Sequence, residues 1–193
     1  MNLKSSFINI FFVKFRVWKY NFLSECKNVF GKPLLFQPLL LNGRGTIIFD
    51  SNCKFGYKDS PSFYNSYSYI EARNSDTIIS IGKNNYFNNN CKIEANTKIE
   101  FGNDNLIGVN CLFLDNDGHD LHPMKRNTDK PKASPILIGN NVFIGDNVTV
   151  LKGVKIGDNT VIGNGSVVTK SFPSNVVIAG NPAVVVKTIS YEN

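Results

Sequence analysis

Both histidines of this 193-residue chain lie in one polar, proline-containing stretch, residues 114–135, which reads LDNDGHDLHPMKRNTDKPKASP. The imidazole of histidine has a pKa of about 6.5, so at pH 7 it is mostly neutral and can take a proton from a reacting group. His122 precedes Pro123, which restricts its backbone to extended conformations, whereas His119 follows Gly118. A histidine in a loop is more often a hydrogen-bonded surface residue than a catalytic base. The elements on either side of the stretch therefore decide how these two histidines are interpreted.

Apolar side chains recur at regular intervals on both sides of this stretch. After it, six of them are spaced by six residues: Ile138, Ile144, Val150, Ile156, Ile162 and Val168. Before it, a similar series has one step of eight: Ile81, Phe87, Ile93, Phe101, Ile107 and Phe113. A period of six fits neither an α-helix nor a long strand, but it fits short strands joined by tight turns of glycine and asparagine. The pattern predicts a solenoid whose coils stabilise one another.

The polar stretch interrupts this solenoid. In a repeat protein an insertion maps to a loop on one face, often the binding face. The polar backbone of residues 115–135 cannot stack inside the coil, so we expect it to be extruded. Residues 57–69 are expected to form another loop that leaves the coil.

The stretch from residue 47 to 186, roughly three quarters of the chain, resembles the hexapeptide-repeat acyltransferases. These include galactoside and maltose acetyltransferases and enzymes that acetylate polysaccharides. The resemblance implies an all-β fold, a left-handed parallel β-helix with three hexads in each triangular coil. We divide the chain into a basic, aromatic capping segment with a short N-terminal helix (1–45), a β-helix acyltransferase domain with one extruded loop (46–186, loop 115–135) and a C-terminal tail (187–193).

The resemblance assigns the role of general base to His119. The family carries a histidine near the start of its extruded loop, and galactoside and maltose acetyltransferases have a Gly-His pair with an arginine seven residues later, where this chain has Arg126. The base removes the proton of an acceptor hydroxyl during its attack on a thioester and can return a proton to the departing thiolate. Asp115 or Asp117 would orient the ring, and backbone amides near Gly145 would stabilise the oxyanion.

The acceptor is expected to bind near His119. The candidate residues are Asn88, Asn90, Arg126 and His122, the last being also the competitor for the role of base. Carboxamides pair well with sugar hydroxyls, and Asn90 matches an acceptor-binding asparagine of the galactoside-type enzymes. The alternative is that the asparagines only serve tight turns.

The resemblance also implies that acetyl-CoA lies in a groove between neighbouring subunits of a homotrimer, with no metal. The residues expected to line this groove are Phe143, Gly145, Gly163, Asn164, Thr169, Lys170 and Lys187. Glycines permit close approach of an amide chain, and lysines offer charge to phosphates, although both lysines fit solvated surface positions equally well. Many relatives have tryptophan in the motif NVWIG, where Phe143 keeps an aromatic surface without the N–H donor.

These residues bear on four functions. The leading hypothesis is an acetyl-CoA-dependent O-acetyltransferase that modifies a sugar hydroxyl in polysaccharide, lipopolysaccharide or capsule biosynthesis. The alternatives are an N-acetyltransferase acting on an amino-sugar nucleotide or an antibiotic, and a non-catalytic β-helix scaffold. A zinc enzyme of the carbonic-anhydrase type needs three histidines, and this chain has two.

Basic residues concentrate before residue 45, in a chain of net charge +6. They are Lys4, Lys14, Arg16, Lys19, Lys27, Lys32 and Arg44, against the single acid Glu25. We expect this segment to cap the coil and pack its aromatic residues on it; the alternative is contact with an anionic membrane surface. No motif indicates nucleic-acid binding.

The remaining features favour the cytoplasm. Cys26, Cys53, Cys91 and Cys111 have no CxxC spacing, which indicates buried free thiols in a reducing compartment. The N-terminus has no cleavage site of a signal peptide, and no apolar run has the roughly 18 residues of a membrane span. The expected location is therefore the cytoplasm, at the inner face of the membrane if the basic segment binds lipid.

Overall fold

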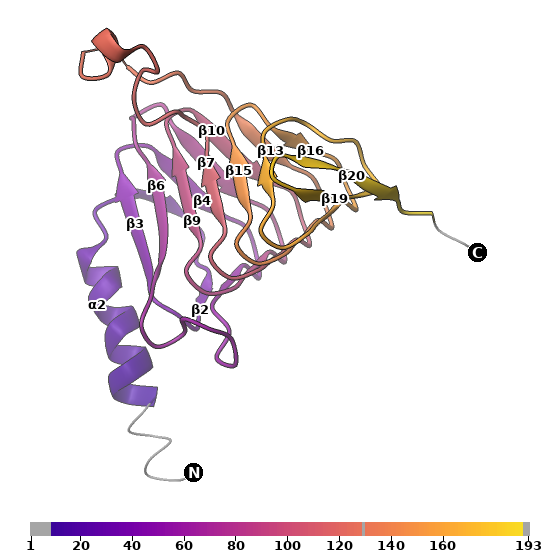
Figure 1. The fold of residues 1–193 in the computed structure, drawn as a ribbon. Helices are drawn as coiled ribbons and strands as arrows, with labels where there is room; N and C mark the ends of the chain where they lie inside the picture. The colour runs from indigo at the N-terminus through magenta and orange to yellow at the C-terminus, as the bar shows by residue number, and fades with distance from the viewer. Residues whose placement is uncertain (1–8, 129, 191–193) are drawn as a thin grey trace.

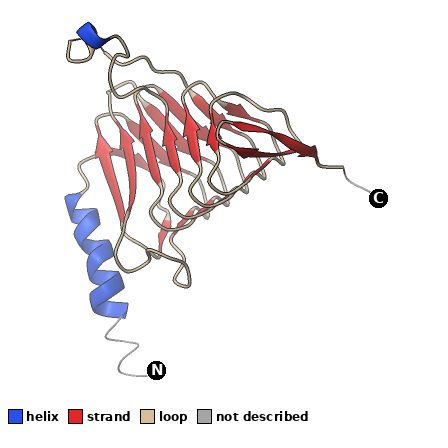
Figure 2. Ribbon diagram, in the orientation of Figure 1, coloured by secondary structure: helices blue, strands red, loops and turns tan. Residues whose placement is uncertain are grey.

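The computed structural model describes residues 9–128 and 130–190. Lys4 of the basic segment and residues 191–193 of the expected C-terminal tail lie outside these described residues. Short parallel strands wind into a triangular coil with one sheet on each of its three sides (Figures 1 and 2). The expected all-β, left-handed parallel β-helix with one short N-terminal helix and one long extruded loop is confirmed.

Each coil contributes one strand to each sheet, in the order A, B, C. Sheet A contains β1 (Asn28–Phe30), β4 (Thr46–Phe49), β7 (Ile78–Ile81), β10 (Lys98–Phe101), β13 (Ile136–Ile138) and β16 (Lys155–Ile156). Sheet B contains β2 (Leu34–Leu35), β5 (Lys54–Phe55), β8 (Tyr86–Phe87), β11 (Leu106–Ile107), β14 (Phe143–Ile144), β17 (Val161–Ile162), β19 (Val176–Gly180) and β20 (Ala183–Thr188). Sheet C contains β3 (Leu39–Gly43), β6 (Ser68–Ala72), β9 (Lys92–Ala95), β12 (Leu112–Leu114), β15 (Thr149–Leu151) and β18 (Val167–Val168).

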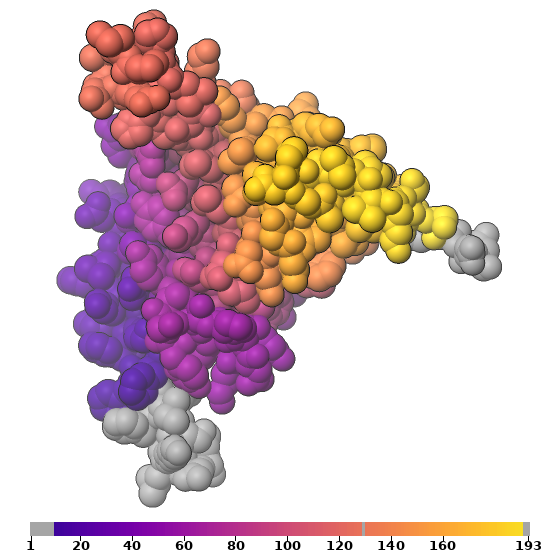
Figure 3. All heavy atoms as spheres, viewed as in Figure 1, coloured from indigo at the N-terminus to yellow at the C-terminus, as the bar shows by residue number. Residues whose placement is uncertain are grey.

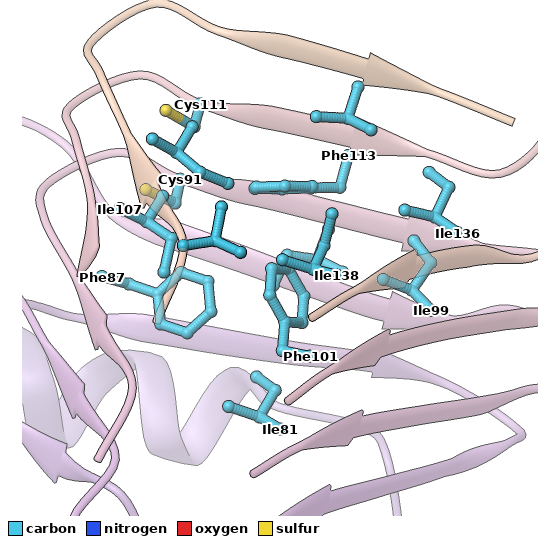
Figure 4. Packing of buried hydrophobic residues seen from close by; sticks show 14 of the residues in the cluster. Ile81, Phe87, Cys91, Ile99, Phe101, Ile107, Cys111, Phe113, Ile136 and Ile138 are labelled. Carbon is cyan, nitrogen blue, oxygen red and sulfur yellow. The ribbon is translucent and has the colours of Figure 1, made fainter. Parts of the chain in front are cut away.

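The inward side chains of successive coils stack on one another and form the core. The rings of Phe87 and Phe113 each contact Phe101 edge-on, at centroid distances of 5.1 and 4.9 Å. Figure 4 shows these rings between the isoleucines of neighbouring strands, with the thiols of Cys91 and Cys111 beside them. The hydrogen bond with Cys111, together with burial, raises the pKa of the Cys91 thiol, and no cysteine forms a disulfide.

Asparagines with positive φ turn the chain at the corners. Asn52, Asn84 and Asp104 occupy equivalent turns with φ near 60° and are joined by side-chain hydrogen bonds of 2.9 and 2.8 Å. Asparagine and aspartate tolerate this left-handed conformation because their short polar side chains form local hydrogen bonds. Polar ladders of this kind fix the register of neighbouring coils along the corners.

The coil begins earlier than the sequence division at residue 46 placed it. The strands β1, β2 and β3 pair with β4, β5 and β6 and form a complete first coil. The segment 1–45 is therefore only in part a cap: the helical part comprises η1 (Asn9–Lys14) and α2 (Phe15–Leu23). At the other end β20 pairs antiparallel with β19 and includes Lys187, the first residue of the expected tail.

The expectation that the helix packs its aromatic residues on the coil was wrong. The side chains of Phe15, Trp18 and Phe22 are 55%, 60% and 78% exposed, and α2 buries none of its residues. The face of α2 that lies against the first coil carries Val17, which borders a groove with Leu35 and Leu39. In the space-filling view the helix lies along the flank of the first coils, at the end opposite the C-terminus (Figure 3).

Two loops leave the coil. Residues 115–135 follow β12 and precede β13, as expected, and contain the short helix η2 (Pro123–Lys125); they project beyond the body of the coil at the top of Figures 1 and 3. Residues 56–67 separate β5 from β6. The first loop lies at the corner between sheets C and A (the C–A corner), and the second at the corner between sheets B and C (the B–C corner).

Truncation of a buried ring tests this account of the core. We expect Phe101→Ala to lower the free energy of unfolding by about 3–5 kcal/mol, because it opens a cavity between two neighbouring rings. Ile48→Ala, on an outward position that is 38% exposed, should change it by less than about 1 kcal/mol. Urea unfolding followed by circular dichroism measures both, and equal losses would contradict the stacked core.

Candidate functional site

A shallow pocket lies at the B–C corner, where strands of sheet B end. Three of its residues take the outward position immediately before an inward one: Tyr86, Leu106 and Phe143. They pair in register across β8, β11 and β14. The full lining is Tyr57, Tyr86, Asn88, Leu106, Ile107, Gly108, Phe143 and Asp146.

The row of outward side chains continues from this pocket across sheet B. Phe143 is paired with Val161, Val161 with Val177, and Val177 with Lys187. Neighbouring strands are about 4.8 Å apart, so Lys187 lies on the order of 14 Å from Phe143 along this row. The pocket is thus connected by an apolar track to an exposed cation.

The two candidate asparagines have different environments. Asn88 lines the pocket, and its side chain donates a hydrogen bond to the hydroxyl of Ser60 (3.0 Å). Asn90 has a φ of 61° and its side chain donates a hydrogen bond to Asn110 (2.8 Å), so it belongs to a turn ladder. Asn90 also borders a separate depression on sheet C.

Gly145, Gly163 and Asn164 also lie at the B–C corner, but the amide of Gly145 is already used. It donates to the carbonyl of Ile162 (2.8 Å), and the amide of Gly163 donates to Ile178 (2.8 Å). The next amide, that of Asp146, donates to the side chain of Asn164 (2.9 Å). In this arrangement Gly145 cannot serve as the oxyanion donor, because its only N–H holds the sheet together.

The ring of His119 is exposed on the long loop, and one of its nitrogens is held. Nδ1 lies 3.0 Å from the carbonyl oxygen of Arg126. A carbonyl only accepts, so Nδ1 must carry the proton, and in the neutral ring Nε2 then keeps its lone pair. The Arg126 backbone, rather than an aspartate, orients this imidazole.

Asp115 holds the base of the loop. Its fully buried carboxylate accepts hydrogen bonds from the backbone amides of Asn96, Thr97 and Lys98 (2.7–3.0 Å) and from the Thr97 hydroxyl (2.8 Å). Its own carbonyl accepts from the amide of Ser134 (2.8 Å), at the far end of the loop. Asp115 thus ties the loop to the preceding coil and closes its two ends on each other.

Asp117 and His122 also have structural partners. The carboxylate of Asp117 forms a salt bridge with Lys152, so neither aspartate is hydrogen-bonded to His119. His122 caps the helix η2, where its Nδ1 accepts from the amide of Met124 (3.3 Å). Its own amide donates to Asp120 (2.8 Å).

The sequence candidates therefore fall into two groups. Phe143, Gly145, Gly163, Asn164 and Asn88 gather at the B–C corner or on sheet B next to it, with Lys187 at the end of the row. His119, His122, Arg126, Thr169 and Lys170 lie at the C–A corner, since the last two follow β18 on sheet C. Tyr57, Tyr86, Leu106 and Asp146 were not among the candidates, although Tyr86 and Leu106 share with Phe143 the position that precedes an inward residue.

Removal of the charge that holds the loop tests the role of Asp115. We expect Asp115→Asn to lower the free energy of unfolding by about 2–4 kcal/mol, because its amide group would face buried N–H donors. Asp104→Asn is the matched control: this carboxylate is exposed, and asparagine tolerates its positive φ, so the change should stay within about 0.5 kcal/mol. Urea unfolding and limited proteolysis of the loop measure the effect, and an unaltered Asp115→Asn variant would contradict it.

The coil, its six-residue period and the single long loop define a class of protein, the hexapeptide-repeat β-helices. The family model "Bacterial transferase hexapeptide (six repeats)" matches residues 135–170. In the described part of the chain no helix has the length and hydropathy needed to cross a membrane. No group of three or more His, Cys, Asp and Glu side chains among these residues is placed to hold a metal ion.

Relatives with names and solved structures resemble the chain over most of the coil. The galactoside O-acetyltransferase of Escherichia coli (strain K12) is 45% identical over 112 residues, 58% of this chain and 55% of the relative. The chain thus spans little more than half the length of this relative. A galactoside acetyltransferase structure in complex with coenzyme A has a TM-score of 0.59 at 32% identity, over 84% of this chain and 66% of the other. The polySia specific acetyltransferase NeuO has a TM-score of 0.57 at 25% identity, over 87% and 86%.

Proposed function

We propose that this protein is an acetyl-CoA-dependent O-acetyltransferase that modifies a hydroxyl of a saccharide, with His119 as the general base. The observation that carries the proposal is the hydrogen bond from Nδ1 of His119 to the Arg126 carbonyl. In the neutral tautomer that donates from Nδ1, the lone pair of Nε2 is on an exposed ring, and this is the form that a general base needs.

The reaction follows from this protonation state. Nε2 takes the proton of the acceptor hydroxyl while its oxygen attacks the thioester carbonyl, giving a tetrahedral oxyanion and an imidazolium. Collapse of this intermediate breaks the C–S bond, forms the ester and expels the thiolate. The imidazolium then returns its proton to the sulfur, which restores the neutral ring. The Arg126 carbonyl stabilises the charged ring because it continues to accept from Nδ1–H.

The row on sheet B is suited to the second substrate, acetyl-CoA. Val161 and Val177 provide apolar contact for an elongated arm between Phe143 and Lys187, and Lys187 supplies charge for phosphates. Open space above Gly165, where a side chain would meet nothing within 4 Å, allows a ligand to approach the turn after Asn164. Thr169 and Lys170 would contribute from the C–A corner of a neighbouring chain.

The pocket at the B–C corner is suited to a sugar acceptor. The rings of Tyr57, Tyr86 and Phe143 provide apolar surface for the C–H face of a pyranose, while Asn88 and Asp146 provide polar groups for its hydroxyls. The named acceptors of relatives, a galactoside and polysialic acid, are saccharides, so we favour cell-surface saccharide over an amino-sugar nucleotide or an antibiotic. Free cysteines support a reducing compartment, and we place the reaction in the cytoplasm.

Substitution of the proposed base is the first test. We expect His119→Ala to lower kcat by about 100-fold to 10,000-fold, while calorimetric titration with coenzyme A shows nearly unchanged affinity. Mass spectrometry of a saccharide panel incubated with acetyl-CoA gives both the activity and the acceptor. His122→Ala is the comparison: loss of activity in that variant, with His119→Ala active, would move the base to His122.

The separation of the two groups of residues supports assembly into a ring. His119 lies at the C–A corner and the pocket at the B–C corner of the same chain, so one chain presents two half-sites. Contact between the C–A corner of one copy and the B–C corner of the next is a heterologous interface, which closes into a ring when the rotation permits. We propose a homotrimer with its sites between subunits.

Mixed oligomers test where the site lies. His119→Ala and the double variant Asn88→Ala/Phe143→Ala should each be inactive as pure oligomers. Co-expressed with different tags and purified through both, they should recover up to about a third of wild-type activity, since each mixed trimer keeps one intact interface of three. Light scattering checks for a trimer, and inactive mixed trimers would place the whole site within one chain.

A further inference from the structure

The outer face of the N-terminal helix carries an aromatic stripe that no other described residue covers. Phe15, Trp18 and Phe22 are spaced three and four residues apart, so they lie on one face of α2. Their rings contact each other in sequence, with centroid distances of 5.5 and 6.1 Å. Helices of globular domains normally turn such a stripe toward the core, and a contiguous exposed apolar patch of this kind marks an interaction surface.

The orientation of the helix is fixed by contacts on its other face. The guanidinium of Arg16 donates to the carbonyl oxygens of Phe63 (3.0 Å) and Ser66 in the loop at the B–C corner. The ring of Tyr20 packs on Tyr67 of the same loop, with centroids 4.5 Å apart. The helix cannot turn its aromatic stripe inward without breaking these contacts, so the exposure of the stripe is built into the fold.

The charge around the stripe identifies the kind of partner. Lys14, Lys19 and Lys32 are exposed on the helix and on the groove beside it, with Glu25 as the single acid before residue 45. A second copy of the same face would bring these like charges together, which opposes association. A surface that is negatively charged and apolar beneath is complementary to both the lysines and the aromatic rings.

We propose that this face docks on an anionic lipid bilayer, with α2 parallel to the membrane plane. Phe15 and Phe22 then enter the boundary between headgroups and acyl chains, and Trp18 lies at the headgroup level, where indole is favoured. Lys14 and Lys19 reach lipid phosphates through their flexible stems. This contact adds to the proposed function without depending on it, because binding needs neither acetyl-CoA nor an acceptor.

The position of Trp18 provides a direct readout. It is the only tryptophan of the chain, so its fluorescence reports this face alone. With the full-length protein and phosphatidylcholine vesicles containing phosphatidylglycerol, we expect a blue shift of the emission, quenching by brominated acyl chains and sedimentation with the vesicles. Pure phosphatidylcholine vesicles should bind at least about tenfold more weakly, and added salt should weaken binding to the anionic vesicles.

Paired variants separate the two contributions. Phe15→Ser/Phe22→Ser and Lys14→Glu/Lys19→Glu should each lower the partition coefficient on anionic vesicles by more than about tenfold. Neither pair replaces a buried residue, and circular dichroism checks that the fold is retained. The matched controls are Ile78→Ser, on an exposed apolar side chain of sheet A, and Lys83→Glu/Lys155→Glu, on exposed lysines of the coil; both should bind like the wild type.

Three outcomes would overturn the proposal. The first is wild-type protein that leaves Trp18 unshifted and does not sediment with anionic vesicles. The second is equal loss of binding in the helix variants and the controls, which would indicate attraction by net charge alone. The third is wild-type protein that does not bind lipid, together with an aromatic variant whose oligomeric state, measured by light scattering, differs from that of the wild type. This result would make a second copy the occupant of this face.

Discussion

The stacking of each coil on the preceding one is the constraint on which the rest of the structure depends. An inward side chain such as Phe101 is buried because Ile81 and Ile138 are paired with it in the coils on either side. The corners must return the chain in few residues, which asparagines at positive φ permit. Because inward positions and turns are fixed together, the outward residues fall into straight rows. The pocket and the row toward Lys187 are consequences of this register.

The six-residue spacing was sufficient to predict the coils from Ile138 to Val168, where no residue departs from the period. The same spacing also continues toward the N-terminus, beyond the domain boundary that was expected at residue 46. Val29, Leu35, Leu41 and Ile47 follow one another at intervals of six, and the first three pack against the core. Gly31, Lys32 and Pro33 interrupt the run of apolar and strand-forming residues, so the first coil was assigned to the cap.

The candidate site was predictable only in part, because a periodic sequence does not state which outward residues meet. The loop and its histidine stand out as an interruption, whereas the pocket joins Tyr86, Leu106 and Phe143 through pairing across three coils. Asn88 and Asn90 are two residues apart, yet one lines the pocket and the other forms a ladder, a difference that follows from the positive φ of Asn90. The role of Asp115 also depends on a contact with the preceding coil.

The N-terminal helix and the pocket are connected through the loop at the B–C corner. The buried carboxamide of Asn89 donates to the carbonyl oxygens of Tyr57 (2.9 Å) and Pro61 (2.8 Å) and accepts from the Tyr57 amide (3.0 Å), which holds Tyr57 at the pocket. Arg16 of the helix donates a hydrogen bond to the carbonyl oxygen of Phe63 in the same loop. Because this loop is held by Asn89 on one side and by Arg16 on the other, the helix and the pocket keep one orientation relative to each other. A surface bound by the helix would therefore meet the pocket at a defined angle, and an acceptor carried on that surface would approach it from one direction.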